Sequence, residues 1–193
     1  MTTIGITGNI GSGKSVVVSL LRTYGIPVYI ADEESKRLVN ASPVIRERLT
    51  ALLGDAIYGP DGLNRRRVAS LLFNDSSLLA QANAIIHPEV ARHFQFWVHQ
   101  QSAGYAALES AILFESGFDR TVDLRVMVYA PQPLRLQRVM ARDRMTETEV
   151  LSRMDNQLSD EIKKQRSDYV IINDGKQALI PQTEKFILYL YGE

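Results

Sequence analysis

Three glycines, a lysine and two serines lie within eight residues near the start of the chain, in the stretch GNIGSGKS at positions 8–15. Gly8, Gly13, Lys14 and Ser15 have the spacing G-x-x-x-x-G-K-[ST], which is typical of a loop whose main-chain N–H groups surround phosphate oxygens. In such a loop the lysine contacts the β- and γ-phosphates and the hydroxyl binds Mg²⁺. An ordinary glycine-rich turn is the alternative, but it does not require this lysine–serine pair. The stretch therefore predicts a site for a nucleoside triphosphate.

The flanking residues predict how this loop is held. Residues 3–7 (TIGIT) are short and β-branched, as in a strand, and residues 15–24 place apolar side chains at helical spacing. The loop would then open a helix, so that the first amides and the positive end of the helix dipole face the bound anion.

Phosphoryl transfer also needs a carboxylate that accepts the proton of the attacking hydroxyl. Asp32 follows IPVYIA, at the expected carboxyl end of a strand over residues 26–30. We therefore predict that Asp32 is the general base. Alternatively, Asp32 caps a helix that begins at Glu33, and both roles are compatible.

Arginines are expected to supply further positive charge. Arg138 and Arg142 are four residues apart and share one face of a predicted helix. A planar guanidinium suits a phosphate group or stacks on adenine, which favours arginine on a segment that closes over a nucleotide. A merely solvated helix face is the alternative.

The remaining pattern predicts an α/β fold. Further strands are expected over residues 106–113, 124–130 and 168–172, with helical patterns between them. This alternation is typical of a parallel sheet covered by helices on both faces, here with five strands and the organisation of a P-loop NTPase.

Two long intervals interrupt the alternation of strands and helices. Residues 40–103 carry several helical patterns, and residues 138–167 are helical and rich in arginine. Ligands of open α/β sheets bind beyond the carboxyl ends of the strands, where both intervals emerge. We expect one domain over residues 1–193, with the first insertion as a helical substrate-binding lobe and the second as a lid.

The composition excludes several classes of protein. Lys plus Arg equals Asp plus Glu at 22 each, so an excess positive field for nucleic acid is absent. The chain has no cysteine, which excludes disulfides and thiolate chemistry. It also has neither an apolar run of roughly 20 residues nor a signal-peptide pattern. We expect a cytoplasmic protein without membrane or nucleic-acid partners, as a monomer or weak homo-oligomer.

From end to end the sequence resembles the dephospho-coenzyme A kinase family. The matching pieces, in family order, are ITGNIGSGKS, ADEESK at 31–36, DGLNRR at 61–66, IHP at 86–88, ILFE at 112–115, RVMARD at 138–143, Gln157 and DYVIINDG at 168–175. Only the first is widespread among other enzymes, and the set together is specific. The resemblance implies transfer of the γ-phosphoryl group of ATP to the ribose 3′-hydroxyl of dephospho-coenzyme A, the last step of coenzyme A synthesis.

The resemblance also implies roles for individual residues. Asp32 matches the second acid of the family's D-A-D pattern, whose first acid is replaced here by Ile30, and would be the base. The residues implied in nucleotide binding are Gly8, Gly11, Ser12, Gly13, Lys14, Ser15, Val16, Arg138, Arg142 and Asn173. Lys14 and Arg142 would act on the transferred group, and Ser15 on Mg²⁺.

Substrate contacts are implied for Asp32, Lys36, Arg65 and His87. Arg65 has the alternative of an ion pair with Asp61, and His87, which precedes proline, has the alternative of ending a helix. Glu109 stands where the family often has aspartate, which leaves open a contact near the metal.

Two other functions remain open from the residues. A related kinase would bind a nucleoside monophosphate or another metabolite in the helical lobe. A nucleotide-dependent switch would bind a protein instead, but the run Asn173-Asp174-Gly175-Lys176 lacks the N-K-x-D pattern of guanine recognition.

Overall fold

The computed structural model describes residues 1–73 and 75–192, which form two compact units. One unit combines Met1–Ile30 with the chain from Gln100 onward and contains the main sheet. The other unit, Ala31–His99, is mostly helical. The predicted insertion over 40–103 falls largely in this helical unit, which starts earlier in the chain. Its role as a substrate lobe stays a prediction.

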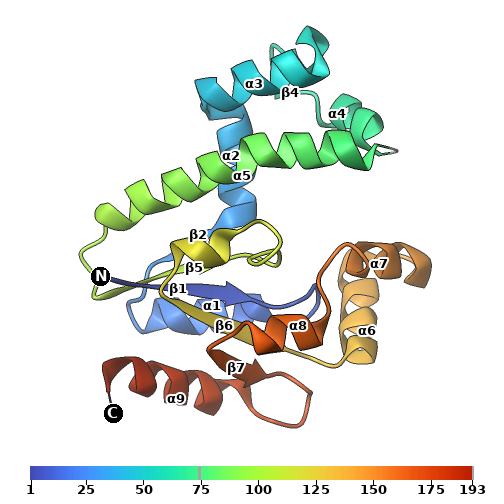
Figure 1. The fold of residues 1–193 in the computed structure, drawn as a ribbon. Helices are drawn as coiled ribbons and strands as arrows, with labels where there is room; N and C mark the ends of the chain where they lie inside the picture. The colour runs from blue at the N-terminus through green and yellow to red at the C-terminus, as the bar shows by residue number, and fades with distance from the viewer. Residues whose placement is uncertain (74, 193) are drawn as a thin grey trace. The chain divides into compact units, whose positions relative to one another are not determined.

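The main sheet has five parallel strands in the order β2-β5-β1-β6-β7 (Figure 1). Their bounds are β1 (Thr2–Thr7), β2 (Val28–Ile30), β5 (Tyr105–Glu109), β6 (Leu124–Tyr129) and β7 (Tyr169–Ile172). The predicted five-stranded parallel α/β sheet is therefore confirmed. Because β1 is central, the loop that follows it emerges in the middle of the sheet's carboxyl edge.

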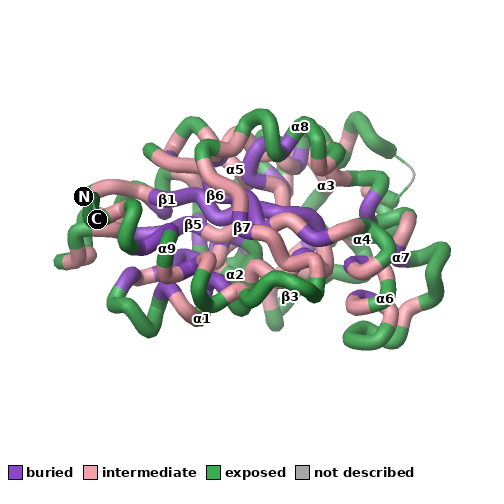
Figure 2. Tube along the Cα trace, turned by 90° about the horizontal axis from the view of Figure 1, so that it is seen from below, coloured by how far each residue is buried: buried purple, intermediate pink, exposed green. Residues whose placement is uncertain are grey.

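Within the described residues of this unit, five α-helices and one short 3-10 helix accompany the sheet. They are α1 (Lys14–Thr23), α6 (Gln132–Asp143), α7 (Glu147–Met154), α8 (Asp160–Gln165), α9 (Leu179–Tyr191) and η2 (Phe118–Thr121). The strands form the buried centre of the unit, whereas much of α6 and α7 is exposed (Figure 2).

Alternation along β1 explains how both faces of the sheet are covered. Ile4 and Ile6 are fully buried in one core with apolar residues of α1 and α9. Gly5 points to the opposite face, where the side chains of Leu113 and Val122 lie so close that a Cβ would meet Leu113 at 2.8 Å. The sheet is thus buried on both faces, as expected for parallel strands.

The predicted strand over residues 106–113 is wrong at its end, because β5 stops at Glu109. Ser110 still donates its N–H to the carbonyl of Ile6, at 3.0 Å. Its hydroxyl then accepts the N–H of Ile112 at 3.2 Å, which turns the chain out of the ladder. The apolar run that follows packs as a turn segment rather than as strand.

The helical unit contains four α-helices, a 3-10 turn and a small hairpin within the described chain. Their bounds are α2 (Ala31–Ala41), α3 (Pro43–Leu53), η1 (Asp55–Ile57), β3 (Tyr58–Gly59), β4 (Gly62–Leu63), α4 (Arg65–Leu72) and α5 (Ser76–His99). Leu38, Ile45, Ile57 and Phe94 are among its buried apolar side chains. Asn40 accepts the N–H of Leu63 at 2.8 Å, which ties the hairpin to α2.

The alternative that His87 ends a helix is wrong, because α5 runs through Pro88. A proline in a helix loses one hydrogen bond and usually kinks or breaks the helix. Here the helix carries buried Ala82 on one side of the proline and buried Val90 and Phe94 on the other. Packing of both halves outweighs the lost bond. Among the described helices, none is both long and apolar enough to cross a membrane.

Candidate active site

The loop between β1 and α1 depends on glycine conformations. Gly8 and Gly11 have φ angles of +142° and +80°, which side chains with a Cβ rarely adopt. A Cβ at Gly11 would also lie 2.7 Å from the carbonyl oxygen of Arg135. The main chain can therefore follow this path only with glycine at these two positions.

The loop presents the uncapped start of α1. Gly13 is the N-cap residue, and no side chain of the described chain caps the helix. The first amides of a helix lack partners within the helix and carry partial positive charge. Ser12 Oγ and Thr7 Oγ1 beside them are buried without a hydrogen-bond partner in the described residues. The site thus offers donors to an anion, as a phosphate group requires.

Lys14 lies against this loop rather than in solvent. Its Nζ donates to the carbonyl oxygen of Gly8 at 2.8 Å and lies 3.8 Å from Oε1 of Glu109. Glu109 is the last residue of β5 and pairs in register with Ile6 of β1. The neighbouring strand therefore brings a carboxylate to the loop lysine, with both side chains largely buried.

Arg138 and Asn173 meet at the loop, as a shared nucleotide site requires. Arg138 donates to the carbonyl oxygens of Gly11 (3.5 Å) and Asn173 (3.4 Å) and to Oδ1 of Asn173 (3.2 Å). Asn173 in turn donates from Nδ2 to the carbonyl oxygen of Ser12 at 2.8 Å. Ser12 and Asn173, 161 positions apart in the sequence, thus meet at the loop, although the roles of Arg138 and Asn173 toward nucleotide stay predictions.

Arg142 is not brought to the loop. It donates from Nε and Nη2 to the carboxylate of Asp143 at 2.7 and 2.9 Å, and its side chain is 63% exposed. The hydrogen bonds to Asp143 raise the pKa of Arg142 and lower that of Asp143. To act on a phosphate group, Arg142 would first have to break its hydrogen bonds to Asp143.

The residues fit a divalent cation held mainly by phosphates. Ser15 and Val16 lie exposed in the first turn of α1, and the Ser15 hydroxyl makes no hydrogen bond within the described chain. The described residues contain no cluster of three His, Asp or Glu side chains for a metal. Mg²⁺ usually keeps several waters and takes few protein ligands beside substrate phosphates. A serine hydroxyl at the loop suits that arrangement.

Asp32 and Lys36 lie on α2 of the helical unit. The interpretation that Asp32 caps a helix beginning at Glu33 is wrong, because α2 begins at Ala31 directly after β2. The Asp32 carboxylate lies in the first turn, where the helix dipole favours negative charge. Lys36 follows one turn later, so the two exposed side chains share a face.

Arg65 and His87 also belong to the helical unit. Arg65 starts α4 and is exposed, and among the ion pairs of the described residues there is none between Arg65 and Asp61, so that alternative is wrong. His87 is partly buried on α5, and burial lowers its pKa, which favours a neutral imidazole near pH 7.

A cavity of about 380 Å³ next to Arg65 is lined by Asn64, Arg66, Arg67 and Ser70. The sequence analysis gave no role to Arg66 or Arg67, although the run RRR at 65–67 was the available signal. Their positive charge adds an anion-binding character to this part of the helical unit.

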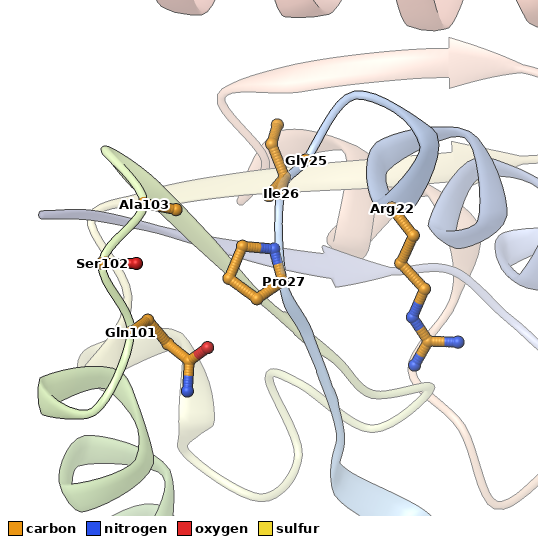
Figure 3. Close-up of a pocket in the computed structure, with 7 residues that line it drawn as sticks. All are labelled: Arg22, Gly25, Ile26, Pro27, Gln101, Ser102 and Ala103. Carbon is orange, nitrogen blue, oxygen red and sulfur yellow. The ribbon is translucent and has the colours of Figure 1, made fainter.

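A second cavity, of about 310 Å³, lies in the sheet-containing unit, at the amino ends of the strands (Figure 3). Its residues, which include Arg22, Pro27 and Gln101, precede or flank the amino ends of β2 and β5. The phosphate loop instead follows the carboxyl end of β1. This cavity is therefore separate from the candidate active site.

Comparison with known proteins gives a consistent result. A family model described as dephospho-CoA kinase matches residues 2–178. A dephospho-CoA kinase of Bacteroides fragilis is 49% identical over 189 residues, which are 97% of this chain and 92% of that protein.

Solved structures agree with the sequence comparison. The crystal structure of TT1252 from Thermus thermophilus has a TM-score of 0.84 and 37% identity, covering 97% of this chain and 96% of that one. A dephospho-CoA kinase from Campylobacter jejuni has a TM-score of 0.68 at 20% identity, with the same coverage. The latter likeness supports the fold alone.

Proposed function

The chain belongs to the dephospho-CoA kinase family, and from that premise we propose that it phosphorylates the ribose 3′-hydroxyl of dephospho-coenzyme A. ATP is the donor, and the products are coenzyme A and ADP. The observation that carries the proposal is the uncapped start of α1 at the end of the glycine-rich loop. Lys14 is held at this loop beside Glu109. The family assignment from the sequence motifs is confirmed by the family match.

The sheet-containing unit binds the triphosphate in this proposal. Loop amides and Lys14 hold the β- and γ-phosphates, and Arg138 with Asn173 borders the nucleotide where these two side chains contact the loop. We propose Mg²⁺, with Ser15 as protein ligand. When bound, the ion would offset negative charge on the β- and γ-oxygens.

The helical unit supplies the acceptor side. The ribose 3′-oxygen attacks the γ-phosphorus, and the bond from that phosphorus to the β–γ bridging oxygen breaks, releasing ADP. Asp32 accepts the hydroxyl proton, and Arg142 leaves Asp143 to neutralise charge on the transferred group. Lys36, Arg65 and His87 would hold the coenzyme A portion.

The direct test supplies dephospho-coenzyme A, ATP and Mg²⁺ and identifies the product by mass and by its 3′-phosphate. Nucleoside monophosphates and shikimate serve as competing acceptors. We expect ADP release that requires dephospho-coenzyme A and stops on chelation until Mg²⁺ is restored. Preferential phosphorylation of another acceptor would refute the substrate. Slow hydrolysis indifferent to every acceptor would instead indicate a switch.

The proposed base is tested by Asp32→Asn. Turnover should fall by roughly two to four orders of magnitude while ATP affinity stays nearly unchanged, because only the proton acceptor is lost. Glu33→Gln is the matched control, since Glu33 is the neighbouring exposed acid in the same turn of α2. If Asp32→Asn kept full turnover, Asp32 would not be the general base.

A further inference from the structure

The second residue after Gly8 in the phosphate loop hydrogen-bonds a residue far along the chain. The N–H of Ile10 donates to Oε1 of Gln157, at 2.9 Å. Gln157 follows the end of α7, and its Nε2 lies 3.5 Å from the carbonyl oxygen of Ala111. The Ile10 amide is therefore directed at a side chain and not at the phosphate position.

Asn9, the residue before, is held by the same segment. Its Nδ2 donates to the carbonyl oxygen of Leu158 at 3.1 Å and to Oδ1 of Asp160 at 2.8 Å. Asn9 is 5% exposed. Two consecutive loop residues are thus fixed by residues 157–160, before the loop reaches Gly11 and the amides that face the phosphate.

Residues 157–160 are themselves anchored to the body of the unit. Oδ2 of Asp160 pairs with Nη2 of buried Arg135 at 2.7 Å. The N–H of Leu158 donates to Oε1 of Glu115 at 2.9 Å, and the same oxygen lies 2.8 Å from Nζ of fully buried Lys163. The segment therefore has a firm position from which to set the loop.

We propose that Gln157 is a positioning residue of the phosphate loop. Its side-chain carbonyl fixes the Ile10 peptide and through it the path of Gly11–Lys14, without contact to the nucleotide. Without this acceptor, the partly buried Ile10 N–H is unsatisfied and the loop populates other paths. Apparent nucleotide affinity then falls in proportion to the fraction of competent loop. The inference extends the proposed function but requires only that the loop binds a nucleotide.

The test compares Gln157→Leu with Asn156→Leu. Both replace an amide with leucine, but Asn156 is exposed in the turn after α7, and among the described residues its side chain donates only to the carbonyl oxygen of Ser152 in that helix. Calorimetry measures Mg·ADP binding, and kinetics gives separate constants for ATP and dephospho-coenzyme A. We expect Gln157→Leu to weaken ADP and raise KM for ATP about tenfold. The kcat and the KM for dephospho-coenzyme A should stay within about threefold, and Asn156→Leu should match wild type.

A double-variant cycle with Asn9→Ala adds an independent measurement. If both residues act on one loop path, the ADP affinity of the double variant should be about the same as that of the single variant with the lower ADP affinity. Strictly additive losses, or wild-type ADP affinity in Gln157→Leu, would overturn the proposal. Equal losses toward both substrates with a lowered melting temperature would also overturn it, because they indicate general damage. The ADP measurement remains decisive even if dephospho-coenzyme A is not the acceptor.

Discussion

Two parts of the segment predicted to be a lid, residues 138–167, differ in how their charged groups are held. We call residues 160–163 with their partners Arg135 and Glu115 the base, and residues 142–143 at the end of α6 the tip. At the base, Arg135 and Lys163 are buried, and their partners Asp160 and Glu115 are 16% and 19% exposed. At the tip, where α6 ends, Arg142 is 63% exposed, and its one ion pair within the described residues is with its sequence neighbour Asp143. One region is built into the core of the unit, and the other extends into solvent.

This difference separates groups that fix geometry from a group that can change partner. Removing one member of a buried pair strands the other charge, whereas an exposed pair contributes little. Arg138, one turn before Arg142 on α6, is intermediate because it already contacts Gly11 and Asn173. The contacts in the structure therefore predict that substitutions at the base lower stability. The catalytic effect expected at the tip follows from the role proposed for Arg142 and not from a contact present in the structure.

The strongest test of the comparison is Arg142→Met. If Arg142 moves onto the transferred phosphoryl group, kcat should fall by about 10²–10³, the loss typical of one donor to developing charge. The unfolding temperature should not change, because the side chain is 63% exposed and such an ion pair contributes little to stability. Arg153→Met is the control, since Arg153 is also exposed and lies 4.0 Å from the same carboxylate. A normal kcat would mean that the tip arginine is only solvated.

Lys163→Met tests the base. The substitution leaves Glu115 without its cation and removes the bond to the carbonyl of Ala111, so the free energy of unfolding should fall by about 3 kcal/mol. Lys164→Met is the matched control at the adjacent exposed position. Denaturant unfolding of the two variants measures the difference. If the two variants had the same free energy of unfolding, the buried contacts of Lys163 would contribute nothing to stability.

The sheet and the phosphate loop could be predicted because their signals are local. Short β-branched runs, an intervening G-x-x-x-x-G-K-[ST] pattern and helical spacing after it determine strand, loop and helix without distant contacts. The error at residues 110–113 arose because an apolar run does not show where a strand ends. There a serine hydroxyl, not hydrophobicity, turned the chain.

Glu109 beside Lys14 and Gln157 beside Ile10 could not be placed from sequence spacing. Each pair joins residues about a hundred or more positions apart, and only strand order and helix packing bring them together. The continuation of α5 through Pro88 was missed for the same reason, since local propensity was overridden by tertiary packing. Gln157 was recognised in the sequence as a family match, but its contact was not predictable.

Arg138→Met tests the intermediate position. Its loss should raise KM for ATP roughly tenfold with a smaller change in kcat, because the guanidinium bridges Gly11 and Asn173 before nucleotide arrives. Arg138→Lys should recover only part of the affinity, since an ammonium lacks the planar fork that reaches both residues. Steady-state kinetics at varied ATP separates the two constants. A pure kcat effect would place Arg138 with the tip rather than the base.

Asp143→Asn should give the smallest effect and tests the tip directly. The change frees Arg142 from its present partner, so ATP affinity should rise, by less than about fivefold because the exposed pair is weak. Since Arg142 lowers the pKa of Asp143, the pair is intact at neutral pH. The ratio of variant to wild-type affinity should therefore be constant from about pH 6 to about pH 9. Reduced affinity would show that Asp143 orients Arg142 toward the nucleotide instead of competing for it, and the tip would then be preorganised like the base.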